Sequence, residues 1–149
     1  MKVLIQRVTR GAVSIDGACV GRIDKGFVIL VGVRTGDVAA DAAVLARKTV
    51  ALRIFPDVEG RMNRSLAEIG GSALVISQFT LYADTRKGNR PSFILAGDPA
   101  VAESLYDAYV AGLAGLLGPD RVQTGRFGAE MQVELVNDGP VTIELTTDR

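Results

Sequence analysis

The chain contains no histidine. Catalytic triads built on histidine, histidine-ligated zinc sites and a histidine general base are therefore excluded, and no other side chain ordinarily titrates between about pH 5 and 8. The single cysteine, Cys19, also excludes an internal disulfide and a multi-cysteine zinc site. We therefore expect neither a metal ion nor another cofactor, and any catalysis must rest on other groups.

Long apolar runs and an excess of charge of one sign are absent as well. No apolar run approaches the ~18 residues of a membrane-spanning helix, and the charges at Lys2 and Arg7 come too early for a signal peptide. These absences predict a cytoplasmic protein without a membrane partner. The 17 basic and 17 acidic residues cancel, so we expect no broad electrostatic grip on nucleic acid and no DNA partner, although a local basic patch remains open.

The residues that are present predict one α+β domain over residues 1–149. This length lies near the common domain size of about 100–150 residues, and 48% of the residues are hydrophobic. Most segments have the pattern of strands and two have the pattern of helices. The order indicates a mixed, mostly antiparallel sheet or partly closed barrel with the two main helices on one side.

Strands are predicted from alternating or continuous apolar runs. A hairpin is expected at residues 13–20, where Asp16 and Gly17 supply a tight turn. The continuously apolar run 27–33 is expected to lie at the centre of the sheet, buried on both faces. The other expected strands are residues 3–8, 73–81, 131–135 and 141–145.

Two helices are predicted from apolar residues at helical spacing and from capping residues. Asp37 is expected to cap the first, and residues 50–55 fit either its end or the next strand. The second has Asp98 as its cap, Pro99 in its first turn and a stop at residues 118–119. Its apolar side is expected to hold Val101, Leu105, Ala108, Tyr109, Gly112, Leu113 and Leu116.

The segment Ser77, Gln78, Phe79 and Thr80 places polar side chains in an otherwise apolar run. A buried polar group without a partner costs roughly 1–3 kcal/mol, so this cluster needs internal hydrogen bonds or a ligand, unless one face of the strand is solvated. Alternation puts Ser77 and Phe79 on one face, so all four side chains converge only at a strand end or a bulge. With no adjacent base evident, Thr80 is not expected to be a nucleophile.

Two loops have the composition of nucleic-acid contacts. Arg86, Lys87 and Arg90 lie close to Phe93, and such cations suit phosphate oxygens while an aromatic ring can stack on a base. The alternative is a solvated loop that raises solubility. Phe127 has small glycine neighbours and either stacks on a flat ligand or packs into the core.

The segment Asn137, Asp138, Gly139 and Pro140 separates the last two apolar runs and predicts a tight hairpin turn. Pro140 has no N–H to donate, so it is expected at a strand start or an edge. A cis Gly–Pro bond is permitted here. Such a tip would be a rigid surface without side chains, which can exclude a substituent by shape.

Residues 77–81 (SQFTL) together with residues 137–142 (NDGPVT) resemble the paired signature of the D-aminoacyl-tRNA deacylase family. The resemblance extends in order along the chain, through residues 5–8, 52–55, 82–88, 90–93 and 127–131. It implies a homodimeric hydrolase that cleaves the ester between tRNA and a D-amino acid, or glycine mischarged on tRNA-Ala, and that rejects L-amino acids.

The same resemblance implies roles for individual residues. In this family a Gly–cis-Pro segment of one subunit enters the active site of the other, which assigns Gly139 and Pro140 to excluding the L side chain. Ser77, Gln78, Phe79 and Thr80 become the catalytic segment. Arg7 is expected to orient the Gly–Pro segment, Phe127 to contact the terminal adenine, and Met131 and Asn137 to bind substrate. Arg86, Lys87 and Arg90 are expected to contact phosphates of the tRNA acceptor stem.

The family chemistry agrees with the missing histidine, because an aminoacyl ester is already activated and the 2′-hydroxyl of the terminal ribose can assist the attacking water. Positioning and stabilisation of the oxyanion then supply much of the acceleration. Two alternatives remain open. One is a non-catalytic dimeric module that binds RNA ends, and the other is a deacylase for a different small ester or amide.

Overall fold

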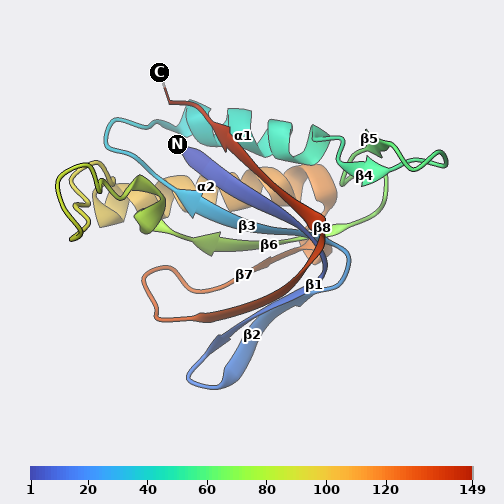
Figure 1. The fold of residues 1–149 in the computed structure, drawn as a ribbon, viewed down its shortest axis with the longest axis horizontal. Coiled ribbons are helices and arrows are strands. Elements are labelled where there is room, and N and C mark those ends of the chain that lie inside the picture. The colour runs from blue at the N-terminus through green and yellow to red at the C-terminus, as the bar shows by residue number, and fades with distance from the viewer. Residues whose placement is uncertain (149) are drawn as a thin grey trace.

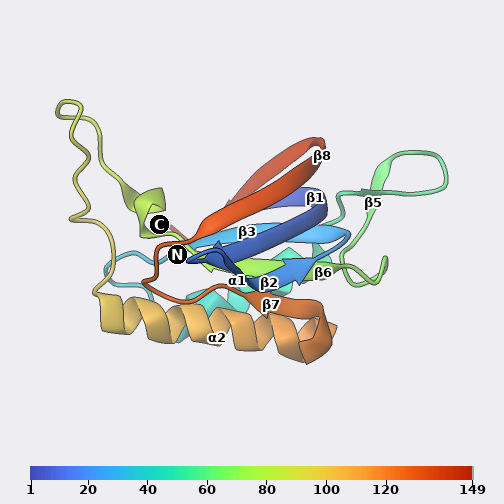
Figure 2. The ribbon, with the colours of Figure 1, turned by 90° about the horizontal axis from the view of Figure 1, so that it is seen from below.

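The computed structural model describes residues 1–148 and contains a six-stranded mixed sheet with two long helices on one face (Figures 1 and 2). The six strands of this sheet are β1 (Lys2–Ile15), β2 (Ala18–Ile23), β3 (Gly26–Gly32), β6 (Ser72–Ser77), β7 (Val122–Thr124) and β8 (Gln132–Thr146). Strands β4 (Phe55–Pro56) and β5 (Met62–Arg64) form a separate two-stranded sheet. Its helices are α1 (Ala39–Ala51) and α2 (Pro99–Leu117), with short 3₁₀ helices η1 (Phe79–Tyr82) and η2 (Pro119–Arg121). The expected α+β class is confirmed.

The long strand β1 organises the sheet. Its first half pairs with β3 and its second half with β2, while β8 runs antiparallel along nearly all of it. Strands β3, β6 and β7 are parallel neighbours, so the strand order is β2-β1-β3-β6-β7 with β8 on β1. Because one strand is shared by three partners, the sheet curls into a nearly closed barrel (Figure 1). Among the described residues no helix is long and apolar enough to cross a membrane.

Strand β3 is central and buried on both faces, as its continuously apolar sequence predicts. Phe27 and Ile29 belong to the core between the sheet and the helices, whereas Val28 belongs to a second cluster inside the curled sheet. The predicted hairpin between β1 and β2 is also confirmed. Asp16 and Gly17 both have positive φ, at 50° and 80°, as a tight two-residue turn requires.

The two helices pack on each other and on one face of the sheet (Figure 2). Asp98 caps α2 by accepting the Ala100 N–H at 3.0 Å, and the helix runs from Pro99 to Leu117 as expected. The expected Asp37 cap is wrong. Helix α1 begins after Val38, whose N–H is bound by the Asp41 side chain, whereas Asp37 instead accepts hydrogen bonds from the Arg34 N–H and the Met1 amino group.

The buried side of α2 differs from the predicted one by a rotation around the helix. Val101 and Leu116 are each 50% exposed, while Tyr106, which the predicted apolar side omits, is buried. The buried residues of the helix are Ala102, Leu105, Tyr106, Tyr109 and Leu113. The difference arises because α2 must also cover the end of β6, where the Tyr106 hydroxyl donates to the Val75 carbonyl at 2.8 Å.

Two strand predictions are wrong in their extent. Strand β6 ends at Ser77 rather than at residue 81, and the chain continues into the 3₁₀ helix η1. The predicted hairpin at residues 137–140 does not exist, because β8 is a single strand from Gln132 to Thr146 that bulges there. Strand β1 continues without a break beside this segment, and β8 pairs with it both before and after the Asn-Asp-Gly-Pro segment. The chain of β8 therefore bulges and does not reverse direction.

Candidate active site

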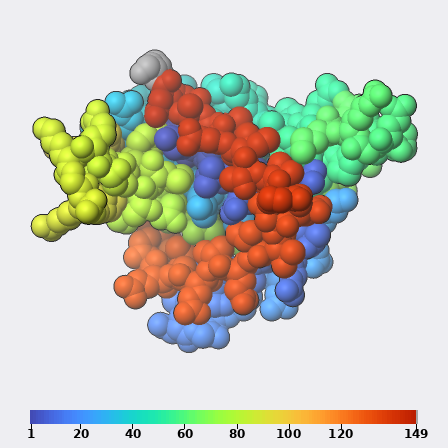
Figure 3. All heavy atoms as spheres, in the orientation of Figure 1, coloured from blue at the N-terminus to red at the C-terminus, as the bar shows by residue number. Residues whose placement is uncertain are grey.

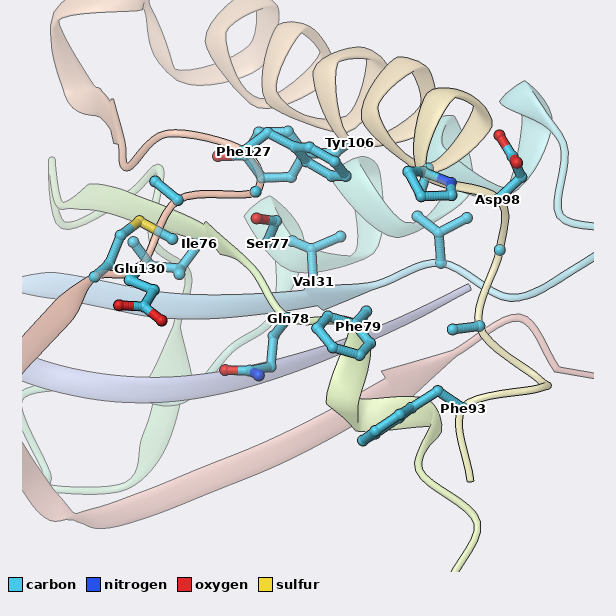
Figure 4. A pocket seen from close by; sticks show the side chains of 18 of the residues that line it. Val31, Ile76, Ser77, Gln78, Phe79, Phe93, Asp98, Tyr106, Phe127 and Glu130 are labelled. Carbon is cyan, nitrogen blue, oxygen red and sulfur yellow. The ribbon is translucent and has the colours of Figure 1, made fainter. Parts of the chain in front are cut away.

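A pocket of about 860 Å³ opens where β6 ends (Figure 4). Its floor is formed by the end of β6 and by β3, and its walls by the start of α2 and the loops of residues 93–98 and 127–131. Residues that lie far apart in the sequence therefore converge at one end of the parallel part of the sheet. This is the edge at which open α/β sheets ordinarily bind ligands.

The 77–80 segment supplies three of the pocket residues. Ser77 is the last residue of β6, and Gln78 and Phe79 lead into η1, so strand alternation stops and all three line the pocket. The Gln78 N–H is bound to the Val31 carbonyl at 2.7 Å, which fixes the turn. Thr80 does not line the pocket, and its hydroxyl is instead bound by the Gln78 side-chain amide. The strand thus ends as convergence requires, but only three of the four residues line the pocket.

Aromatic rings stand on two sides of the pocket (Figure 4). Phe127 lies against Tyr106, with ring centroids 5.9 Å apart, beneath α2. Phe79 and Phe93 form an edge-on pair with centroids 4.9 Å apart. Tyr106 was not among the predicted site residues, although its position four residues after Ala102 and three before Tyr109 places it on the buried helix face. Burial raises the pKa of its hydroxyl, which stays a neutral donor.

Met131 shapes the loop that carries Phe127. Its sulfur lies 3.4 Å from the Arg126 nitrogen, and a Cβ at Gly125 would lie only 2.5 Å from that sulfur. The thioether therefore occupies the space that the missing side chain of Gly125 leaves. Met131 and Phe127 both line the pocket.

The carboxylates at the pocket do not form a catalytic pair or a metal site. Asp98 and Glu130 line it, and Asp98 is engaged in capping α2. Within residues 1–148, no group of three or more His, Cys, Asp or Glu side chains gathers to hold a metal ion. What the pocket offers is therefore an apolar, aromatic cavity with hydroxyl and amide groups at its floor, suited to orienting a ligand.

The Gly139–Pro140 tip lies apart from this pocket. The two residues are exposed and joined by a cis peptide bond, whereas Asn137 and Asp138 at the base of the bulge are partly buried. Arg7, only 11% exposed, donates from Nε to the Asp138 carbonyl at 2.8 Å and from Nη1 to the Ile54 carbonyl at 2.6 Å. None of residues 137–141 lines the pocket of its own chain.

The structure thus divides the predicted site residues other than Thr80 into three groups. Ser77, Gln78, Phe79, Phe127 and Met131 come together in the pocket. Asn137, Gly139 and Pro140 lie in the bulge of β8, where the Asn137 side chain bonds to its own strand, and Arg7 of β1 donates to the Asp138 carbonyl beside them. Arg86, Lys87 and Arg90 lie in a loop beyond the pocket and do not line it.

The basic loop projects from one end of the molecule, opposite the hairpin of β4 and β5 (yellow and green in Figure 3). Its base is closed by Asp84 and Ser92, whose backbone groups exchange hydrogen bonds of 2.8 and 2.9 Å. Arg86 is paired with the Asp84 carboxylate, with Nη2 at 2.6 Å from Oδ2. Lys87 and Arg90 are exposed to solvent. Much of the loop's free positive charge therefore rests on these two.

Comparison with known proteins shows the family to which this chain belongs. The family model of D-Tyr-tRNA(Tyr) deacylase matches residues 4–146. The D-aminoacyl-tRNA deacylase of Thermomicrobium roseum is 57% identical over 145 residues, which are 97% of this chain and 93% of that protein. The D-aminoacyl-tRNA deacylase of Akkermansia muciniphila is 53% identical over 143 residues, which are 96% of this chain and 95% of that protein.

Solved structures share the fold. The structure of a c-Myc DNA unwinding element binding protein matches with a TM-score of 0.95 and 37% identity, and covers 100% of both chains. A probable eukaryotic D-amino acid tRNA deacylase matches with a TM-score of 0.84 over 97% of both chains. At 18% identity, this second likeness concerns the fold alone.

Proposed function

The chain belongs to the D-aminoacyl-tRNA deacylase family and is an ester hydrolase acting on aminoacyl-tRNA, and from this premise we propose how it chooses its substrate. It removes D-amino acids, and glycine mischarged on tRNA-Ala, at a pocket that a second copy of the chain completes. The Gly139–Pro140 tip of each copy enters the pocket of the other and excludes L side chains.

One observation carries the proposal. The two motifs that resemble the family's active site lie apart within one chain, because residues 77–79 line the pocket and the exposed Gly139–Pro140 tip does not. A site that contains both motifs needs a neighbouring copy, and the exposure of the tip leaves it free to enter that copy. A two-fold dimer would form two such sites, each built from both chains.

Selection by shape suits the chemistry of this tip. Gly139 has no side chain and Pro140 presents only its ring, so the tip is compact, and Arg7 ties its base to the body of the protein. A compact, fixed surface close to the α-carbon collides with a side chain on one side of that carbon. In glycine and in D-amino acids a hydrogen atom occupies the position of the L side chain on the α-carbon, and this hydrogen fits beside the tip.

Hydrolysis needs no titrating side chain in this scheme. Water attacks the ester carbonyl carbon, the bond to the ribose oxygen breaks, and that oxygen takes up a proton, with the vicinal 2′-hydroxyl assisting the water. The Gln78 side chain and the backbone amides near Phe79 and Thr80 orient the substrate or stabilise the oxyanion. The Gln78 N–H is already bound to Val31, so it is not one of these donors.

A three-substrate assay tests the activity. The protein is incubated with D-tyrosyl-tRNA, with L-tyrosyl-tRNA and with D-tyrosine ethyl ester, and release of tyrosine is followed. The proposal predicts hydrolysis of D-tyrosyl-tRNA alone. Binding of both tRNAs without release would instead identify a non-catalytic module for RNA ends, and hydrolysis of the ethyl ester would identify a deacylase for other small esters.

A mixed-dimer assay tests the contribution of the second copy. Phe79→Ala damages the pocket, and Gly139→Ala damages the tip, because its Cβ would lie 2.7 Å from Val141 Cγ2 at a φ of +147°. Co-expressed in equal amounts, the two variants should regain D-selective hydrolysis in roughly a quarter of the sites, since half of the dimers would hold one intact site. Recovery no greater than the sum of the separate variants would contradict the cross-subunit site.

A further inference from the structure

The bulge of β8 interrupts the ladder with β1 at the Gly139–Pro140 tip. From Gln6 to Val8, β1 advances two residues, while the paired residues on β8 pass from Thr142 to Asn137, five positions apart. The residues between them therefore lose the regular pairing that holds the rest of β8. Exposed residues without a ladder are ordinarily mobile, so a tip that selects by shape needs other hydrogen bonds to hold it.

Asn137 supplies these hydrogen bonds. Its Oδ1 accepts the Val141 N–H at 2.7 Å, and its Nδ2 donates to the Val141 carbonyl and to Thr142 Oγ1, each at 3.2 Å. One side-chain amide thus binds both backbone groups of Val141, as a neighbouring strand would. Asn137 thus joins the two ends of the bulge, and the bond from Arg7 Nε to the Asp138 carbonyl is a second link at its base.

We infer that Asn137 is a positioning residue, which closes the base of the bulge and holds the Gly139–Pro140 tip in shape. The resemblance to the family places it among the substrate-binding residues, but its oxygen and its nitrogen are both engaged within the bulge. It therefore acts on the substrate through the tip. The effect on selection between D- and L-amino acids rests on the proposed function. The hydrogen bonds of Asn137 to Val141 and Thr142, which we call the brace, are a property of the chain itself.

The side-chain amide is specific to this task, because it offers an acceptor and a donor side by side. Aspartate retains an acceptor for the Val141 N–H but places a second oxygen against the Val141 carbonyl, and alanine removes both groups. The structure therefore predicts graded effects. Asn137→Asp should keep part of the brace, and Asn137→Ala should lose it.

Two measurements on the full-length protein test the inference. The first is hydrogen exchange of the Val141 amide, measured by NMR, which reports the brace directly. The second is the ratio of kcat/KM for D-tyrosyl-tRNA to that for L-tyrosyl-tRNA, which reports the tip. In Asn137→Ala the Val141 amide should exchange at least about tenfold faster and the D/L ratio should fall by about tenfold, the size of one lost hydrogen bond. Asn137→Asp should lie between this variant and the parent.

Gln132→Ala is the matched control, because it removes an exposed side-chain amide from the same strand. It should change neither quantity. Unchanged Val141 exchange in Asn137→Ala would overturn the inference, and so would a raised KM for D-tyrosyl-tRNA with an unchanged D/L ratio, which would indicate a direct substrate contact. If the parent protein hydrolysed D- and L-tyrosyl-tRNA equally well, the proposed function would be wrong. The exchange rate of the Val141 amide would still show whether Asn137 holds the bulge.

Discussion

The Thr80 hydroxyl is bound to the side-chain amide of Gln78, outside the pocket lining. An amide does not take up a proton at neutral pH, so this contact does not activate the hydroxyl for attack. The arrangement suits a residue that orients the side chain of Gln78, which is a residue of the pocket lining. The missing histidine is consistent with this view, because histidine is the usual base for a hydroxyl nucleophile.

Replacement of Thr80 by alanine tests this role. We expect kcat/KM for D-tyrosyl-tRNA to fall by less than about tenfold, or about 1.4 kcal/mol of transition-state stabilisation, because only a contact to Gln78 is lost. Single-turnover hydrolysis measures the effect, and Thr80→Ser serves as the control that keeps the hydroxyl. Complete loss of turnover, with substrate binding and the fold intact, would show that Thr80 takes part in the reaction.

Asp84 at the base of the basic loop provides a prediction on pH. Hydrogen bonds from the side chain and backbone of Arg86 hold the pKa of its carboxyl at about 2. A lowered pKa in the folded state means that the stabilisation is present above the ordinary value of 3.8 and is lost as the pH falls through about 2. Carboxyl NMR should show Asp84 titrating near this value, and Arg86→Ala should raise it. An unchanged titration in that variant would contradict the pairing.

Strand ends and helix caps show which elements can be recognised locally. The start and stop of α2 were predicted correctly, because Asp98, Pro99 and Gly118 act through contacts within a few residues. The end of β6 at Ser77 was not, because an apolar run continues to residue 81. There the chain turns where Gln78 bonds to Val31 of the neighbouring strand, a contact that the local sequence does not contain.

The contact between the two helices includes a buried polar pair. Thr49 of α1 and Tyr109 of α2 are fully buried, and their hydroxyl oxygens lie 2.9 Å apart. Thr49→Val should lower the free energy of unfolding by about 1–3 kcal/mol, because it leaves the Tyr109 hydroxyl buried without this partner. Denaturant unfolding measures the change, and Thr9→Val, on the exposed part of β1, is the control.

A double-mutant cycle makes the test sharper. Combining Thr49→Val with Tyr109→Phe removes both hydroxyls, so the loss should be smaller than the sum of the single losses by about 0.5–3 kcal/mol. Additive losses would mean that the two hydroxyls do not stabilise the helix contact together.

The whole molecule has no net charge, so its contact with tRNA must be local. We expect Lys87 and Arg90 to contact phosphates and Arg86 to contribute less, because Asp84 already neutralises it. In a plot of log affinity for tRNA against log salt, Lys87→Ala with Arg90→Ala should reduce the slope by about 1–2, at roughly 0.9 for each phosphate contact. Adding Arg86→Ala should change it little further.

The control for this loop replaces two exposed cations elsewhere, Arg47 and Lys48 of α1, by alanine. These changes remove equal charge and should leave most of the slope intact. If both double variants reduced the slope equally, the effect would reflect net charge, and the loop would have no special place in binding.

Features that depend on residues close together in the chain can be predicted from the sequence. Asp16 and Gly17 adopt the positive φ angles of their turn wherever the flanking strands pair, and the continuous apolar run of β3 is stable only when both of its faces are buried. The motifs at residues 77–81 and 137–142 were equally visible, and they led to the family.

The use and the position of the 137–140 segment depend on contacts between distant parts of the chain, which the sequence does not reveal. The same four residues suit a hairpin turn and a bulge, because both need a local departure from the strand, and the choice depends on the partner. Strand β1 is 14 residues long and pairs with β8 on both sides of the segment, so the chain bulges and continues. Because β8 continues along β1, the tip does not line the pocket of its own chain. Pairing between β1 and β8 joins residues far apart in the sequence, so the local sequence pattern could not predict it.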